Sequence, residues 1–145
     1  MQLVNFSFGS LLEAQMELNN MNRADIAKKL GISINNTYGT FSLFKQNKGN
    51  LNKFIDYANA LNKKVLFIFS KDDKIVKNPD WTAGLLLDFI ISEEKIKTSD
   101  IQNKLGITNQ SLNTRLRNLK KNQGKISTLI ELTETIGYKV TIEFI

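Results

Sequence analysis

Apolar residues recur every three to four positions through most of the chain, which is the period of an amphipathic helix. Shorter runs rich in β-branched and aromatic residues separate these segments and predict strands. Eight helices are expected, at 9–19, 23–30, 34–46, 51–61, 81–92, 98–105, 109–121 and 127–136. Strands are expected at 2–8, 65–70, 74–77 and 139–145. The pattern therefore predicts a mainly α fold whose short β-strands form one or two small antiparallel sheets.

The same pattern occurs twice along the chain. The segment DIAKKLGIS at 25–33 returns as DIQNKLGIT at 100–108, and this offset of 75 residues aligns 9–69 with 84–144 without a gap. Self-similarity at a fixed offset indicates two copies of one structural unit. Pro79 is the only proline and disfavours helix at the residue before it. We therefore assign 1–78 to a first unit and 79–145 to a second.

Each unit contains two helices separated by a glycine turn. In the first unit Gly31 is placed to end one helix in the left-handed conformation, and Ser33 is placed to cap the next helix. The chain resembles the lambda-repressor/Cro-type (XRE-like) helix-turn-helix family, most closely over LGITNQSLNTRLRNLKKNQGKISTLIELTETIGYKVTIEFI. This resemblance implies two tandem four-helix helix-turn-helix units, each followed by a C-terminal strand and joined by small antiparallel sheets.

In that family the second helix of the motif enters the major groove of DNA, where each base pair presents its own donors and acceptors. The implied base-contacting residues are Asn109, Gln110, Asn113, Thr114 and Arg117 in the second unit, with Asn35, Asn36 and Tyr38 in the first. The implied phosphate-contacting residues are Thr108, Arg115, Lys120, Lys121 and Lys125 in the second unit, with Ser33, Lys45 and Lys48 in the first.

The first unit departs from this pattern. Thr37 occupies the position of the inward Leu112, and Gly39 lowers helix stability by about 1 kcal/mol relative to alanine. The outward positions of its second motif helix carry no charge. Two alternatives stay open: this helix contacts bases through its amides, or the unit is a docking copy without DNA contact.

Charge and composition narrow the classes of function. The net charge is +6, and five basic residues fall within 115–125 with no acid among them, which favours a polyanion over the alternative of an ordinary solvated helix face. The chain has no cysteine and no histidine, which excludes disulfides, thiol chemistry, the usual zinc sites and histidine-based triads. We expect neither a metal, a cofactor nor an enzymatic activity. No apolar run is long enough for an export signal or a membrane span, so the cytoplasm is the expected location.

These observations predict a sequence-specific regulator of transcription that binds double-stranded DNA, a repressor of phage or plasmid type. Its two units would act as an intramolecular pseudo-dimer on a palindromic or pseudo-palindromic operator. The alternative is a protein-interaction module, such as a phage-encoded inhibitor or antitoxin that uses the same fold. The helix at 81–92 is apolar around most of its circumference and needs cover on more than one side. This cover would come from the other unit or from a second chain, in a homodimer that forms through Leu85, Leu86, Phe89 and Ile90 or through a free strand edge.

Overall fold

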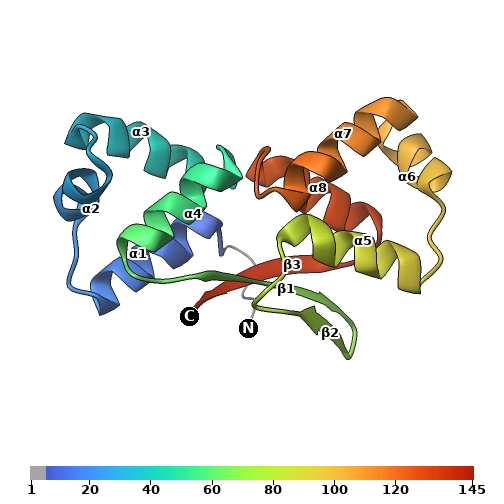
Figure 1. The fold of residues 1–145 in the computed structure, drawn as a ribbon, viewed down its shortest axis with the longest axis horizontal. Coiled ribbons are helices and arrows are strands. Elements are labelled where there is room, and N and C mark those ends of the chain that lie inside the picture. Colours follow the sequence, from blue (N-terminus) through green and yellow to red (C-terminus); the bar gives the residue numbers. More distant parts are fainter. Residues whose placement is uncertain (1–5) are drawn as a thin grey trace.

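The computed structural model describes residues 6–145, which contain eight helices and three strands (Figure 1). The first four helices are α1 (Phe8–Leu18), α2 (Arg23–Leu30), α3 (Ile34–Lys45) and α4 (Leu51–Ala60), followed by strands β1 (Val65–Lys71) and β2 (Lys74–Lys77). The last four are α5 (Ala83–Glu93), α6 (Thr98–Leu105), α7 (Asn109–Lys120) and α8 (Ile126–Thr135), followed by strand β3 (Lys139–Phe144). The prediction of a mainly helical fold with a small antiparallel sheet is confirmed.

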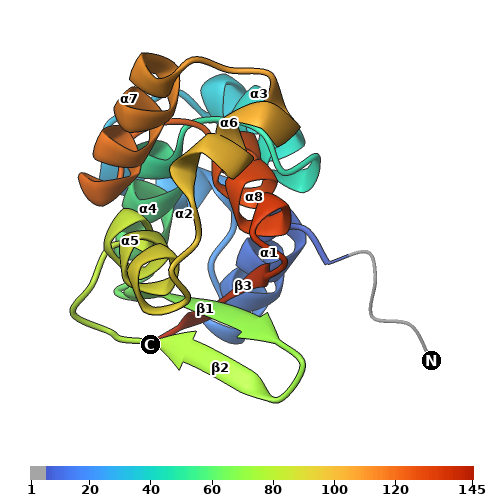
Figure 2. The ribbon, with the colours of Figure 1, turned by 90° about the vertical axis from the view of Figure 1, so that its right-hand side faces the viewer.

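The three strands form one sheet in the order β2–β1–β3, and both neighbouring pairs are antiparallel. Most of the helices lie on one face of this sheet (Figures 1 and 2). Phe67, Phe69 and Ile142 are buried in the sheet, and the Phe54 ring of α4 lies 6.1 Å from the Phe144 ring of β3. The sheet therefore connects the first and last parts of the chain through a shared core.

The residues that the structure describes within the strand expected at 2–8 do not form a strand. Residues 1–5 lie outside the described range, Phe6 and Ser7 belong to no strand, and Phe8 begins α1. The Ser7 hydroxyl accepts from the Ser10 N–H at 3.0 Å, and the Ser10 hydroxyl accepts from the Ser7 N–H at 3.0 Å. This reciprocal capping box starts the helix, and it explains why an alternating sequence did not become a strand here.

The two glycine turns have the conformation that the sequence predicted. Gly31 ends α2 with φ of 69°, and Gly106 ends α6 with φ of 64°, which is the left-handed region that a residue without Cβ adopts most easily. Ser33 and Thr108 then cap α3 and α7, since each side chain accepts from the backbone N–H three residues later. Local sequence therefore determines where both helix pairs begin and end.

Residues 75 positions apart make the same contacts in the two halves of the chain, 6–78 and 79–145. Glu13 of α1 forms an ion pair with Lys45 of α3 at 2.7 Å, and the residues 75 positions later pair at 2.7 Å. A Cβ at Gly9 would lie 2.4 Å from a backbone nitrogen of α3, and one at Gly84 would lie 2.1 Å from the equivalent nitrogen of α7. The repeat in sequence is therefore matched by a repeat in side-chain and backbone contacts.

The two halves meet through contacts between equivalent residues. The Leu51 N–H at the start of α4 donates to the Gly124 carbonyl at 2.8 Å, and the N–H at the start of α8 donates back to Gly49 at 3.0 Å. In the sheet, Phe67 of β1 pairs with Ile142 of β3, which is its own counterpart at the offset of 75. These reciprocal contacts define an approximate twofold axis that passes between Phe67 and Ile142.

The apolar helix α5 is covered mainly by its own chain. It begins two residues later than expected, because the Thr82 hydroxyl accepts from the Leu85 N–H at 3.3 Å. Leu86 and Ile90 are only 1% and 2% exposed, so the prediction that they form a homodimer interface is wrong. Their cover comes from α7 and β2, against which α5 packs.

Candidate nucleic-acid interface

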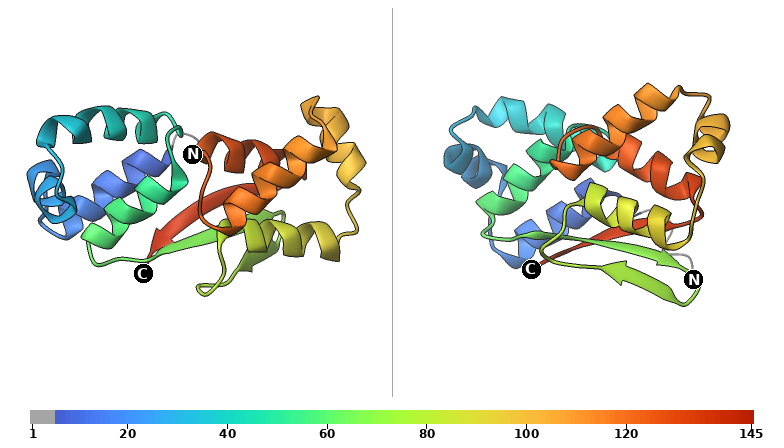
Figure 3. Two further views of the ribbon diagram at one scale, coloured as in Figure 1. Left: turned by 45° about the horizontal axis from the view of Figure 1, so that its top comes forward. Right: turned by 45° about the vertical axis from the view of Figure 1, so that its right-hand side comes forward.

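Helices α3 and α7 lie on the same side of the molecule, away from the sheet (Figures 1 and 2). Each helix runs from the outer end of its half toward the centre, where the connections α3–α4 and α7–α8 lie beside each other (Figure 3). The pairing of Asn50 with Lys125 joins these two connections. The sheet pairing and this bridge fix the two helices relative to each other, so their outward side chains share one face.

Helix α7 separates its apolar and polar residues cleanly. Leu112, Leu116 and Leu119 are buried, while the predicted base-contacting residues Asn109, Gln110, Asn113 and Arg117 are exposed. Two of these have partners within the chain: Gln102 donates to the Asn109 side chain at 3.1 Å, and Arg117 donates to the Thr114 hydroxyl at 3.3 Å. Exposed amide and guanidinium groups of this kind match the major-groove edges of adenine and guanine.

Helix α3 presents a neutral and partly apolar face. Asn35 and Asn36 are exposed, together with Ile34, Tyr38 and Leu43, whose exposed fractions are 40%, 55% and 45%. Thr37 points inward as predicted, and its hydroxyl donates to the Ile34 carbonyl at 2.6 Å, so its burial leaves no unpaired polar group. The contrast with α7 that the sequence indicated therefore exists on the folded surface.

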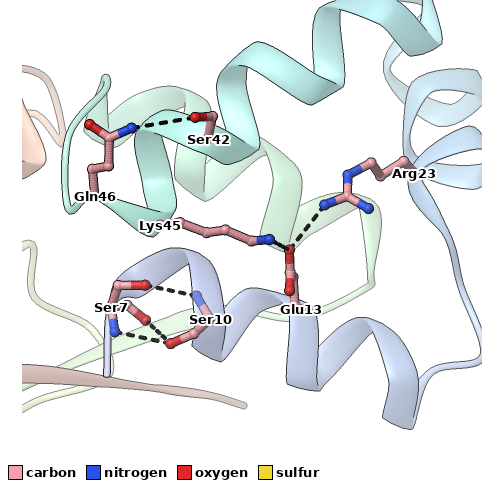
Figure 4. Close-up of polar contacts among 7 residues, drawn as sticks. All are labelled: Ser7, Ser10, Glu13, Arg23, Ser42, Lys45 and Gln46. Atoms are coloured by element: carbon pink, nitrogen blue, oxygen red, sulfur yellow. Dashed lines mark hydrogen bonds and ion pairs between the residues drawn. The ribbon is translucent and has the colours of Figure 1, made fainter. Parts of the chain in front are cut away.

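Arg23 of α2 was missed by the sequence analysis, although it organises the face around α3. Its guanidinium donates to the Glu13 carboxylate at 3.0 Å (Figure 4). It also lies 4.8 Å from the Phe41 ring centroid and 5.5 Å from that of Tyr38. A guanidinium over an aromatic ring is an attractive cation–π arrangement, so Arg23 restrains the predicted base-contacting Tyr38. No local motif could indicate this role, because the partners of Arg23 lie on α1 and α3.

Two of the predicted phosphate contacts already have a partner. Lys45 forms its ion pair with Glu13 (Figure 4), and Lys120 forms the equivalent pair with Asp88 of α5 at 2.7 Å. The stretch 115–125 contains no acid, but the fold brings Asp88 beside it. These ion pairs help to hold α1 on α3 and α5 on α7, and the assignment of Lys45 and Lys120 to phosphate contact stays a prediction.

Two of the other predicted phosphate contacts lie at a groove where the two halves meet. Lys48 and Lys125 line it together with Lys53, which the sequence analysis did not single out. The groove has a volume of about 480 Å³, and its other lining residues are Thr40, Leu43, Phe44, Gly49, Asn50 and Ser127, none of them acidic. The residues equivalent to Lys48 and Lys53 in the second half are Gln123 and Thr128. The groove therefore departs from the twofold pattern, and it places positive charge beside the C-terminal half of α3.

Two helices begin beside this groove without a side-chain cap. The N-cap residues are Asn50 for α4 and Lys125 for α8, and neither side chain bonds to the first turn of its helix. The first-turn N–H groups and the helix dipole make a helix N-terminus attractive to anions. Lys53 and Ser127 came together here only because the two halves pack against each other, so no local motif could have indicated them. The arrangement suits a phosphate backbone that crosses the centre of the face.

A second polar cluster lies between the β1–β2 hairpin and the loop after α5. The Tyr138 hydroxyl donates to the Glu94 carboxylate, and Lys71 and Lys74 lie 3.6 and 3.7 Å from that carboxylate. The Tyr138 hydrogen bond, with help from the two lysines, lowers the pKa of Glu94. Burial, followed by the adjacent carboxylate, raises the pKa of Tyr138 to about 12. These groups fasten the hairpin to the second half of the chain and are not part of the α3–α7 face.

No family model, curated protein or solved structure matches this chain. Within residues 6–145, no helix is both long and apolar enough to cross a membrane. The same range holds no group of three or more acidic side chains arranged to bind a metal ion.

Proposed function

We propose that the protein is a sequence-specific regulator of transcription that binds double-stranded DNA. Its two halves would be tandem helix-turn-helix units, α1–α4 and α5–α8, that act as an intramolecular pseudo-dimer. Helices α3 and α7 would enter successive major grooves on one side of the duplex, about 34 Å apart. The bound operator would then be pseudo-palindromic, and regulation would be by repression.

The observation that carries this proposal is the set of reciprocal contacts about the twofold axis between Phe67 and Ile142. Operators with twofold symmetry are bound by proteins with the same symmetry. The exposed amides and Arg117 on α7 supply groups suited to base edges, and the groove lined by Lys48, Lys53 and Lys125 supplies groups suited to phosphates.

The two half-sites would differ in strength. Helix α7 carries Arg117 and is followed by Lys121, whereas the exposed side chains at the corresponding positions of α3 are Ser42 and Gln46. We therefore infer a well-defined half-site under α7. The half-site under α3 would be degenerate and held mainly through phosphates in the groove.

Selection of binding sites from random duplex DNA tests the proposal directly. We expect two recognisable half-sites separated by about one helical turn, one defined more strongly than the other. Light scattering of the protein–DNA complex should give a stoichiometry of one chain per operator. Two chains on a palindrome of α7 half-sites would contradict the pseudo-dimer, and binding with no sequence preference would contradict the proposed function.

The exposed apolar residues of α3 favour one alternative, a protein-interaction module. Ile34, Tyr38 and Leu43 would contact a protein partner in place of DNA. The two functions differ in their response to salt, because phosphate contacts release counterions and apolar contacts do not. Binding to a protein partner that persists as the salt concentration rises, without any sequence-specific binding to DNA, would support the alternative.

A further inference from the structure

The outward side of α3 differs in kind from the corresponding side of α7. Five of its residues follow at the spacing i, i+1, i+4, i+5 and i+8, which places them on one side of a helix. All five are exposed, namely Ile34, Asn35, Tyr38, Gly39 and Ser42. The residues 75 positions later are Asn109, Gln110, Asn113, Thr114 and Arg117. These counterparts are the predicted base contacts of α7, so the same side of α3 would meet the bases of the other half-site.

Two positions on this side of α3 carry large apolar groups in place of amides. Ile34 and Tyr38 lie one helical turn apart and are 40% and 55% exposed, whereas α7 has asparagine at both equivalent positions. The fold therefore does not require an isoleucine or a tyrosine here. Exposed apolar groups gain stability when a partner removes them from water, so this pair suits an apolar group on the bound molecule.

The Tyr38 ring is restrained before any partner binds. The Arg23 guanidinium lies 5.5 Å from its centroid and 4.8 Å from that of Phe41, and it donates to the Glu13 carboxylate at 3.0 Å. The second half has Thr98 in place of Arg23, so this arrangement belongs to the first half alone. A side chain that is already restrained loses less conformational entropy on binding, so Tyr38 presents a prepared contact surface.

Gly39 leaves the backbone of α3 bare on the same side. Glycine is among the least favourable residues inside a helix. A Cβ added at Gly39 would have no atom within 4 Å, so no packing within the chain requires the glycine. Its counterpart in α7 is Thr114, which shows that the position accepts a side chain in the other half. Glycine permits close approach between a backbone and a ligand, so Gly39 suits a contact from outside the chain.

The surroundings of this side favour nucleic acid as the bound molecule. The groove beside the C-terminal half of α3 is lined by Lys48, Lys53 and Lys125 and by no acidic residue. Phosphate contacts at such a groove would hold a duplex against the helix. Asn35 supplies an amide of the kind that matches adenine, and thymine, the partner of adenine, is the base that presents a methyl group in the major groove. The polar and the apolar residues of α3 therefore suit the same base pair.

We propose that α3 recognises A·T base pairs through the 5-methyl groups of thymines, which pack on Ile34 and Tyr38 while the helix backbone approaches the bases at Gly39. This inference rests on the proposed function, because it assigns α3 to a major groove. Apolar contact with a methyl group discriminates less than a bidentate hydrogen bond. The half-site under α3 is therefore rich in A·T pairs but remains the more weakly defined of the two.

Deoxyuridine tests the proposal, because uracil keeps the O4 acceptor and the base pair of thymine but lacks the 5-methyl group. The half-site whose base preference Arg117→Ala relaxes lies under α7, and the other half-site lies under α3. Replacing the thymines under α3 by uracil should weaken binding in a gel shift by about fourfold for each methyl group that is fully buried. The same replacement under α7 should have a smaller effect.

The matched variant is Ile34→Asn with Tyr38→Asn, which gives α3 the residues that α7 already has. It should fold, and it should bind the thymine and uracil operators equally well. Tyr38→Phe is the control, because it keeps the ring and should keep the preference for thymine. Gly39→Ala should bind the operator about fivefold more weakly or worse, because the added methyl group overpacks the contact. The same substitution favours the helix, so a loss of affinity with a raised denaturation midpoint separates DNA contact from a structural role.

Equal binding of the two operators by the wild-type protein would overturn the proposal. An undiminished preference for thymine in the double variant, or full affinity in Gly39→Ala, would also overturn it. Full operator affinity in the double variant would assign Ile34 and Tyr38 to a protein partner instead. A selected operator with two half-sites but no thymine preference under α3 would remove only this inference. The absence of any selected sequence would remove the proposed function and this inference with it.

Discussion

Replacing Gly84 by alanine tests whether the close crossing of α5 and α7 holds the second half together. The added Cβ would lie 2.1 Å from the Lys120 backbone nitrogen and 2.4 Å from the Leu119 carbonyl carbon. Ordinary contact begins near 3.4 Å, so the helices must separate by about 1.3 Å. Backbone atoms cannot rotate away as a flexible side chain can, so we expect a loss of stability near the upper end of the values that overpacking usually causes. The free energy of unfolding should fall by about 2–3 kcal/mol.

Gly39→Ala is the control, because it makes the same chemical change in α3 with the opposite expected sign. No atom lies within 4 Å of the added Cβ, and alanine favours helix over glycine by about 1 kcal/mol. Urea denaturation followed by far-ultraviolet circular dichroism measures both variants. Gly84→Ala should lower the midpoint and Gly39→Ala should raise it. If Gly84→Ala is neutral or stabilising, then α5 and α7 are not in the contact described here.

The remaining predictions concern DNA and pH. Arg117→Ala should cost about 1–3 kcal/mol on the selected site and relax preference at one or two base pairs, as measured by gel shift. Lys53→Gln should weaken binding to every duplex alike and lower the slope of log affinity against log salt concentration by about one unit. A change in base preference would contradict a phosphate role. Wild-type stability should fall as the pH drops below 4.5, because the pKa of Glu94 is lowered by folding and the unfolded state takes up its proton first. It should fall again between pH 10 and 12, because the pKa of Tyr138 is raised by folding and the unfolded state loses its proton first. In Tyr138→Phe, denaturation at several pH values should show a smaller alkaline loss and a smaller acid loss, since Lys71 and Lys74 still favour the Glu94 carboxylate.

Local sequence predicted most of the helix boundaries, because short-range hydrogen bonds determine them. Gly31 and Gly106 take the left-handed conformation, and Ser33 and Thr108 cap the following helices. The described residues of the strand expected at 2–8 form no strand for the same kind of reason, because a serine capping box competes there with the alternating pattern. Signals contained within four or five residues are therefore the ones that a sequence carries most reliably.

The candidate site was less predictable, because it depends on which distant residues become neighbours. The fold pairs the predicted phosphate contact Lys120 with Asp88, although the two residues lie 32 positions apart. Lys53 gained a place in the groove only because the other half brings Lys125 beside it. Charge counted along the sequence indicates a polyanion partner but does not indicate which cations are free.

The junction explains how one chain can carry two different faces. Equivalent residues meet across the axis at Phe67 and Ile142, which is the isologous geometry of a twofold dimer. Two identical chains that meet in this way must present identical surfaces, and their association depends on concentration. Covalent linkage removes both constraints, because the second half is always present at high effective concentration and its residues can change independently. Arg117 on α7, where α3 has Ser42, is a difference of the kind that this independence allows.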